Sequence, residues 1–219
     1  MRAFRAASRS ICTTRVARNC NCGVPEELAK SLMNPPEDIS NTAPALERLI
    51  LVPFTQNPNE WPSKIPQLIP LASKYRGTMT SVLASYSGEG VVSDKIVVYP
   101  QGASFESLEK LEANMPLDAN VGTTLLICSH MQRDERCGVL GPLLAQSFKE
   151  EIARQGLEIK VRLVSHVGGH KYAGNVLVCG QGRIVWYGMV QPKWVADIVR
   201  SIAEQTTVSE LLRGINKSV

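Results

Sequence analysis

The second half of the chain has the clearest pattern of apolar and polar positions. A short, almost continuous apolar run at 123–128, TTLLIC, predicts a buried strand that is covered on both faces. The stretch 141–156 predicts a helix, with Pro142 in its first turn and Gly156 at its end. Apolar residues recur at every fourth position there and give the helix one apolar face: Leu140, Leu144, Phe148 and Ile152.

The rest of this half alternates between strand and helix signals. Residues 157–165 alternate as a strand, and 175–188 predict a hairpin around the turn GQG. The order strand, helix, strand, hairpin, helix is a thioredoxin-like arrangement, and 207–215 add a short helix with Thr207 and Glu210 as a capping box. The helix that completes the arrangement is expected over 191–205, with Pro192 at its start and an apolar side formed by Trp194, Val195, Ile198, Val199 and Ile202.

The first half mixes strands and helices and could be a degenerate echo of the second. Strands are expected at 48–52, 80–87 and 95–102, a proline-broken helical stretch at 61–75, and a short helix at 104–115 capped by Ser104 or Ser107. The predicted fold class is therefore α/β (α+β). We expect four segments: a leader at 1–20, a smaller mixed α/β region at 21–118, a thioredoxin-like domain at 119–206, and a tail at 207–219.

Charge is concentrated at the N-terminus. The chain has a formal net charge of +4, and five arginines lie in the first eighteen residues, before the first acid, Glu26: Arg2, Arg5, Arg9, Arg15 and Arg18. Without them, 19 basic and 20 acidic side chains remain, so the rest of the chain lacks the basic footprint that nucleic-acid binding needs. No apolar run approaches the roughly 20 residues that span a bilayer, so no membrane span is expected.

The same opening segment predicts a location. It is rich in arginine, serine and threonine, contains no acid, and would be amphipathic as a helix, which is typical of a mitochondrial presequence. The alternative is a disordered basic tail. We therefore expect a mitochondrial protein, in the matrix or the intermembrane space.

Cysteine and histidine gather at the ends of two predicted strands. Cys128 and Cys137 bracket the segment CSHMQRDERC after one strand, and His166 and His170 follow the next strand in HVGGHKYAGN. Loops at such strand ends lie side by side in open α/β sheets, so the four side chains can converge. Two thiols and two imidazoles suit either a structural zinc ion or a [2Fe–2S] cluster, and the ligand types alone leave both open.

The remaining cysteines and the neighbours of the motifs have simpler interpretations. Six cysteines at uneven positions do not predict a disulfide framework; Cys20 and Cys22 belong to a flexible tail, and Cys179 to the core. His130 is expected to form hydrogen bonds near the site rather than to bind the metal. Charged residues beside the motifs orient the loop, offer a docking surface or are simply solvated: Arg133, Asp134, Arg136 and Lys171.

The segments CSHMQRDERCGVLGPLL and SHVGGHKYAGNV together resemble the sucrase/ferredoxin-like family, thioredoxin-fold [2Fe–2S] proteins of fungi and plants. With the basic N-terminus, the resemblance is to the family's fungal mitochondrial members. It covers about residues 120–205 well and the first half loosely. The family holds its cluster with the two cysteines of the first motif and the two histidines of the second, which implies Cys128, Cys137, His166 and His170 as cofactor and metal ligands here.

The expected function is a mitochondrial [2Fe–2S] redox protein that transfers electrons with proton uptake or senses redox state. The alternatives are a zinc-stabilised interaction module and a thiol oxidoreductase in which Cys128 attacks and Cys137 resolves. The sequence contains no G-x-G-x-x-G fingerprint and no paired acidic motif for sugar hydrolysis, so no motif for substrate turnover is present. Electrons would come from an unidentified redox protein partner, and the sequence predicts no oligomeric state.

Overall fold

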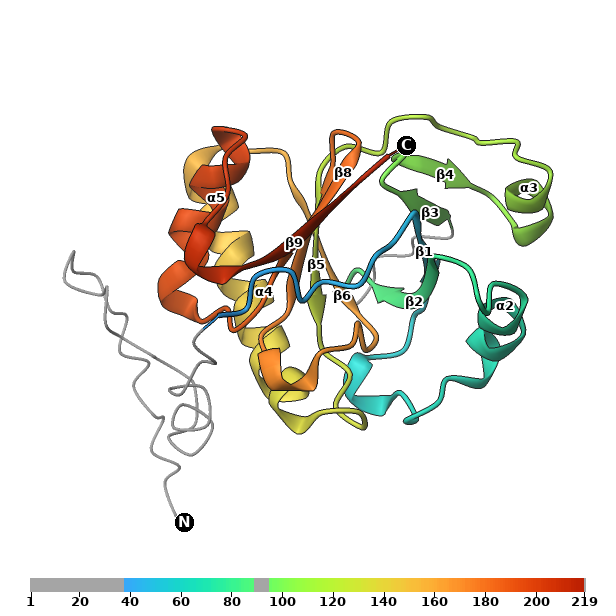
Figure 1. Cartoon of the computed structure of the whole chain (residues 1–219), viewed down its shortest axis with the longest axis horizontal. Coiled ribbons are helices and arrows are strands. Elements are labelled where there is room, and N and C mark those ends of the chain that lie inside the picture. Colours follow the sequence, from blue (N-terminus) through green and yellow to red (C-terminus); the bar gives the residue numbers. More distant parts are fainter. Residues whose placement is uncertain (1–37, 89–94, 219) are drawn as a thin grey trace, which may run out of the picture.

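The computed structural model describes residues 38–88 and 95–218, except for the side chain of His170. The predicted presequence and the Cys20 and Cys22 pair therefore lie outside the described residues. The described chain forms one mixed sheet of nine strands in the order β4-β3-β1-β2-β6-β5-β7-β8-β9. Helices α4 and α5 lie on one side of the molecule and α2 and α3 at the other (Figure 1). None of the described helices has the length and apolar character needed to cross a membrane.

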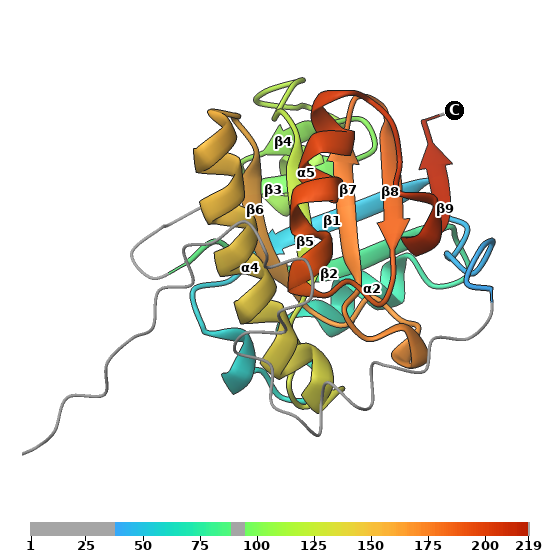
Figure 2. The ribbon, with the colours of Figure 1, turned by 90° about the vertical axis from the view of Figure 1, so that its left-hand side faces the viewer.

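The second half has the predicted order of elements. It comprises β5 (Thr124–Cys128), α4 (Glu135–Gln155), β6 (Lys160–Val164), β7 (Val176–Gly180), β8 (Arg183–Tyr187) and α5 (Val195–Ala203), which the short 3-10 helix η5 (Pro192–Trp194) precedes. Strand β5 pairs with β6 in parallel and with β7 in the antiparallel sense, and β7 and β8 form the hairpin. Figure 2 shows α4 and α5 in front of these strands. The predicted apolar face of α4 is buried throughout: Leu140, Leu144, Phe148 and Ile152.

The first half repeats this topology with shorter helices. It comprises β1 (Arg48–Pro53), the 3-10 helices η2 (Pro58–Glu60) and η3 (Pro66–Leu68), α2 (Ile69–Lys74), β2 (Thr80–Tyr86), β3 (Ile96–Tyr99), β4 (Ala103–Phe105) and α3 (Leu108–Glu112). Strand β1 pairs with β2 in parallel and with β3 in the antiparallel sense, and β3 pairs with β4. In the same way, β5 pairs with β6 and with β7, and β7 pairs with β8. The suggested echo is therefore confirmed as a repeated topology. Ser107 caps α3 by accepting a hydrogen bond from the backbone N–H of Lys110.

The two halves are continuous through a short antiparallel contact between β2 and β6. Only Ser85 with Val164 and Tyr86 with Leu163 pair, at the C-terminal ends of both strands. Ser165 extends the junction, since its N–H donates to the carbonyl of Ala84 and its Oγ accepts from the N–H of Ala84, both at 3.0 Å. Because the two strands run in opposite directions and overlap at their ends, the segments that follow β1, β5 and β6 meet near the middle of the molecule.

Both halves also contribute to one hydrophobic core. The main buried cluster includes Leu49, Leu51 and Tyr99 of the first half together with Leu125, Phe148 and Val199 of the second. The expected α/β class is thus confirmed, with the first half as part of the same sheet and core rather than a separate layer. The segment boundaries at 20, 118 and 206 remain predictions.

The start of α4 differs from the prediction. The helix begins at Glu135 instead of near Pro142, because Asp134 caps it: the Asp134 side chain accepts a hydrogen bond from the backbone N–H of Arg136. Pro142 lies inside the helix, where it lacks the N–H of the usual backbone hydrogen bond. The predicted end is correct, since Gly156 is the C-cap in the left-handed conformation at φ 66°. Cys137 consequently belongs to the helix and not to a loop.

The predicted C-terminal helix is wrong. Residues Ser209–Leu211 form a single 3-10 turn, η6, without a side-chain cap, and Leu212–Lys217 form strand β9. Strand β9 pairs with β8, with Ile215 opposite Val185. The backbone of β8 would otherwise remain unpaired at the sheet edge, and this tertiary pairing outweighs the local capping pattern at Thr207 and Glu210.

Candidate metal centre

The two cysteines of the first motif meet through a tight strand-to-helix turn. Cys128 is the last residue of β5 and Cys137 the third of α4, and both are free thiols with 1% exposure. Two glycines of α4 allow the helix to lie against the turn. A Cβ on Gly138 would come within 2.7 Å of the Met131 Cα, and one on Gly141 would overlap the Ser129 hydroxyl. The nine-position spacing is therefore bridged by close packing of the helix on the turn.

Hydrogen bonds to the sulfur of Cys128 favour its thiolate. The S–H of Cys137, the imidazole of His166 and the backbone N–H of Val167 donate to it, and they lower its pKa although burial opposes this. The pKa of Cys137 is raised because it donates to Cys128 and is buried. The N-terminal end of the 21-residue helix α4 adds a positive partial charge beside both sulfurs. The pair is thus arranged to carry negative charge in a buried place, as a metal-binding thiolate must.

The second motif forms a glycine-rich turn after β6. Gly168 and Gly169 adopt φ values of 85° and 73°, which side-chain-bearing residues rarely adopt, so the chain can reverse sharply between the two histidines. His166 lies at the start of this turn, with its Nδ1 atom fully buried. His170 begins the short 3-10 helix η4 (His170–Tyr172), and its side chain is outside the described part of the structure.

Three of the four sequence-predicted ligands are therefore brought together: Cys128, Cys137 and His166. Cys128 forms hydrogen bonds with each of the other two, and among the side chains that the structure describes no three Cys, His, Asp or Glu groups surround a single-ion position. Two buried thiols and an imidazole joined through Cys128, with the residue His170 in the same turn as His166, fit a metal centre with soft sulfur and nitrogen ligands. The donor set fits a [2Fe–2S] cluster held by two residues on each iron.

His130 connects this centre to the first half. Its Nε2 atom lies 3.0 Å from the carbonyl oxygen of Pro62, and its Nδ1 accepts a hydrogen bond of 3.4 Å from the backbone N–H of His166. The ring also contacts Trp61 edge to face, with centroids 5.8 Å apart. Burial lowers the pKa of His130, which favours the neutral ring with Nε2–H donating to Pro62. Because both ring nitrogens form hydrogen bonds, the geometry agrees with the predicted supporting role.

Trp61 and Pro62 are supporting residues that the sequence did not single out. They belong to the loop after β1, and Trp61 is fully buried with its indole N–H donating to the carbonyl of Gln56 at 3.1 Å. The loop packs on His130, 68 residues further along the chain than Pro62. A tryptophan between several prolines was the only sequence signal for such a contact. The first half, whose role the sequence left open, thus contributes to the wall of the candidate centre.

The first half has the same scaffold without metal ligands. The last register pair of β5 and β6 is Cys128 with Val164, and that of β1 and β2 is Pro53 with Ser85. Pro53 therefore takes the place of Cys128, and Ser87 that of His166. The sequence contains no cysteine or histidine between residues 23 and 127. Only the second half can provide the predicted set of four ligands.

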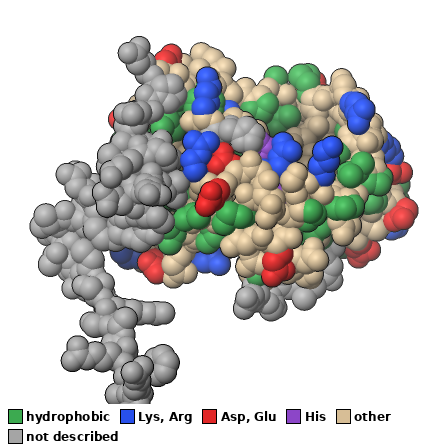
Figure 3. Space-filling model, turned by 90° about the horizontal axis from the view of Figure 1, so that it is seen from below, with side chains coloured by type: hydrophobic (Ala, Val, Ile, Leu, Met, Phe, Trp, Pro, Cys, Tyr) green, Lys and Arg blue, Asp and Glu red, His purple; other side chains and the backbone are tan. Residues whose placement is uncertain are grey.

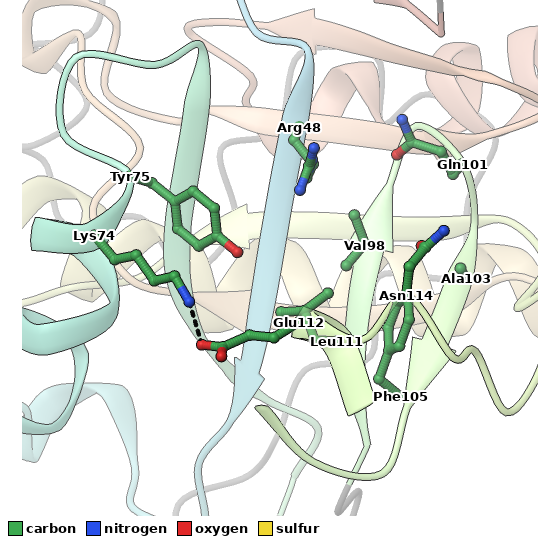
Figure 4. A pocket seen from close by; sticks show the side chains of 10 residues that line it. All are labelled: Arg48, Lys74, Tyr75, Val98, Gln101, Ala103, Phe105, Leu111, Glu112 and Asn114. Atoms are coloured by element: carbon green, nitrogen blue, oxygen red, sulfur yellow. Dashed lines mark hydrogen bonds and ion pairs between the residues drawn. The ribbon is translucent and has the colours of Figure 1, made fainter. Parts of the chain in front are cut away.

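The first half does have a cavity of its own, of about 430 Å³. Figure 4 shows it between α2, α3 and the sheet, with the Lys74–Glu112 ion pair at one side. Val98, Phe105 and Leu111 are among its apolar lining residues. It is lined by no cysteine or histidine, so it is not an alternative location for the metal centre.

The charged residues beside the motifs have different roles. Asp134 caps α4 and forms an ion pair of 2.9 Å with Arg136, so these two orient the turn. Arg133 and Lys171 are exposed, and the Lys171 ammonium lies 5.0 Å from the Tyr172 ring centroid. The face that contains these loops, at the bottom of Figure 1, shows several lysine and arginine side chains near a histidine in Figure 3. Elsewhere, Cys179 is fully buried in β7, as predicted.

Several known proteins are similar to this chain in sequence. A relative from Debaryomyces hansenii, "Altered inheritance of mitochondria protein 32", is 27% identical over an alignment of 270 residues that covers 97% of this chain and 98% of that protein. The protein of the same name from Clavispora lusitaniae is 50% identical over 92 residues, 41% of this chain and 34% of that protein. "Actin patches distal protein 1" of Saccharomyces cerevisiae is 33% identical over 134 residues, 56% of this chain and 40% of that protein. The chain thus aligns with only about a third of the Clavispora lusitaniae relative's length.

A solved structure and a family model complete the comparison. A thioredoxin-like [2Fe–2S] ferredoxin from Aquifex aeolicus is similar over 43% of this chain and 93% of that chain, with a TM-score of 0.37 and 20% identity. The family model described as sucrase/ferredoxin-like matches residues 39–214, which include both motifs and most of the first half. The chain therefore belongs to the sucrase/ferredoxin-like family.

Proposed function

We propose that the chain is a redox protein that binds a [2Fe–2S] cluster through Cys128, Cys137, His166 and His170. The main support is the contact of buried Cys128, at the end of β5, with both the thiol of Cys137 and the imidazole of His166, which follows the neighbouring parallel strand β6. Membership of the family agrees with this donor set. The fourth ligand, His170, is proposed from its place in the same glycine-rich turn.

A [2Fe–2S] core bound there would supply a one-electron couple. Two neutral imidazoles in place of two thiolates make the site about two charges less negative than a four-cysteine site, which favours reduction. The ring nitrogen of His166 or His170 that faces away from the metal would hold the proton taken up with the electron. The buried thiols and the loop with Trp61 would keep water away from the sulfur atoms. We therefore expect a reduction potential above that of plant-type ferredoxins.

The proposed setting is mitochondrial, with a redox protein as the source or acceptor of electrons. The arginine-rich, acid-free first eighteen residues support this location. Two of the relatives are named for altered inheritance of mitochondria, which agrees with it. The exposed cations Arg133 and Lys171 beside the motifs would face the partner.

Anaerobic purification of the full chain tests the proposal. We expect a red-brown protein with equal amounts of iron and acid-labile sulfide, and an electron paramagnetic resonance (EPR) signal after reduction. Cys128→Ser and His170→Ala should each lose most of the iron, and Cys179→Ser, a buried cysteine outside the centre, should keep it. A colourless protein with zinc and no sulfide would instead identify the zinc-stabilised module.

One observation also favours a second function, that of a thiol oxidoreductase. A thiolate-stabilised Cys128 in hydrogen-bond contact with the thiol of Cys137 is the arrangement needed for disulfide exchange. Exchange requires access to the attacking sulfur, however, and both cysteines have only 1% exposure. Reduction of a disulfide substrate by the sulfide-free protein, abolished in Cys137→Ser, would support this function.

A further inference from the structure

Arg213 is a buried cation whose role neither the family resemblance nor the proposed ligand set explains. It lies on β9, outside the thioredoxin-like arrangement, and has 2% exposure. None of the ion pairs between described residues involves it. A guanidinium remains charged at physiological pH, and its burial is costly unless hydrogen bonds and nearby negative charge compensate. Its position therefore requires a physical explanation.

The guanidinium is fixed by neutral groups on several sides. Its Nη1 donates to the side-chain oxygen of Asn175 at 2.6 Å, and its Nη2 donates to the carbonyl of Thr42 at 2.8 Å. Its Nε donates to the Thr42 hydroxyl at 3.2 Å. The ring of Tyr172 lies 4.4 Å and that of Trp186 5.8 Å from the guanidinium carbon. Three directed hydrogen bonds and two aromatic faces hold the charge in one place.

That place is the glycine-rich turn between the two histidines. A Cβ on Gly169 would lie 2.7 Å from Nη2 of Arg213, so the guanidinium packs directly on the backbone one residue before His170. Asn175 extends the contact, since its side-chain N–H donates to the Gly169 carbonyl at 3.4 Å. The backbone carbonyl of Asn175 accepts from the N–H of Cys128 at 3.1 Å. Arg213 is therefore linked, through Asn175, to the turn of the second motif and to the first cysteine.

We propose that Arg213 is a positioning residue of the metal centre: it fixes the turn between His166 and His170 and places a permanent positive charge beside it. This inference builds on the proposed cluster. At a pH above the range of coupled proton uptake, reduction adds one negative charge to the centre, and a fixed cation at short range through protein stabilises that charge more than a solvated cation does. Arg213 therefore raises the reduction potential as well as ordering the turn.

Two substitutions and one control distinguish the effect of the positive charge of Arg213 from the effect of the hydrogen bonds that its guanidinium forms. Arg213→Met removes both, and Arg213→Lys keeps the charge without the planar set of hydrogen-bond donors. Lys217→Met removes an exposed cation about 13 Å further along the same strand. For the anaerobic, cluster-loaded full chain, we expect Arg213→Met to lower the ratio of reduced to oxidised protein at a fixed potential at least tenfold, which is 59 mV for one electron. Lys217→Met should change that ratio less than twofold.

Arg213→Lys should keep most of the potential but broaden the EPR signal, and amide exchange over residues 166–175 should become faster. An Arg213→Met protein that binds the cluster with an unchanged potential overturns the proposal. If Arg213→Met does not fold or bind the cluster, Arg213→Lys decides: wild-type EPR and wild-type exchange refute the positioning role. Amide exchange can also be measured on protein that carries no cluster. Absence of sulfide from the wild type would therefore refute the proposed function, and amide exchange in the variants would still test whether Arg213 fixes the turn.

Discussion

Replacing Trp61 by alanine perturbs the contact between the halves at a residue distant in sequence from all four proposed ligands. Trp61 is fully buried with Ile65, Leu68 and Tyr86, and its ring packs edge to face on His130. Truncation of such a side chain costs about 3–5 kcal/mol. For a chain of this size, each kcal/mol lowers the melting temperature by about 2–4 °C, so we expect a decrease of about 6–20 °C.

The same substitution should alter the metal centre. Without Trp61, the hydrogen bond between His130 and the carbonyl of Pro62 loses its support, and His130 positions the backbone of His166. Loss of one such bond is worth about 1 kcal/mol, which lowers the ratio of ordered to disordered turn about fivefold. We therefore expect Trp61→Ala to broaden the EPR signal of the reduced protein and to release iron faster.

Leu71→Ala is the matched control. Leu71 is buried in a separate cluster of the first half with Ile50 and Phe105. Its truncation costs about 2–5 kcal/mol, so its melting temperature should fall by a similar amount. Its EPR signal should match that of the wild type. If Trp61→Ala and Leu71→Ala leave the signal equally unchanged, the first half does not support the centre through this contact.

Three further predictions concern the ligands, the packing and the response to pH. His166→Cys should retain a cluster with a lower potential, because a thiolate adds negative charge; a higher potential in redox titration would contradict this. Gly141→Ala should reduce iron content, because the new Cβ would overlap Ser129; colorimetric iron assays against Ala145→Gly, which opens space instead, test this. Burial raises the pKa of Tyr99 to about 12, above its unfolded value of about 10. Its contribution to stability is therefore complete below pH 10 and is lost as the pH rises toward 12, so urea unfolding between pH 9 and 11 should show a smaller decline for Tyr99→Phe than for the wild type.

The sequence predicted the second half well because the local patterns of apolar residues there match the surfaces that the sheet and helices bury. The apolar run at 123–128 is a central strand, and the four-residue recurrence from Leu140 to Ile152 matches a helix packed on a sheet. The start of α4 was misplaced because Pro142 suits a first helical turn. Asp134, eight residues before Pro142, provides the actual cap. Pro142 and Asp134 both favour a helix start, and Asp134 determines the boundary because its side chain accepts a hydrogen bond from the helix backbone.

The parts that could not be predicted depend on contacts between distant residues. Residues 207–215 have a local capping pattern, yet they form η6 and most of β9 because β8 offers a free backbone edge. Arg213 near the end of the chain is typical of an exposed cation, and only the arrangement of β9, Thr42 and Asn175 buries it. The contact of Pro62 with His130 is equally invisible in sequence, because neither residue carries a pattern that specifies the other.

Pulsed EPR of the reduced full chain with ¹⁵N-labelled histidine shows directly whether two histidines bind the cluster. We expect magnetic coupling to nitrogens of two histidines, and loss of one of these couplings in His170→Cys. A reduced cluster without histidine coupling, or a protein that binds no iron and sulfide at all, would contradict ligation by Cys128, Cys137, His166 and His170.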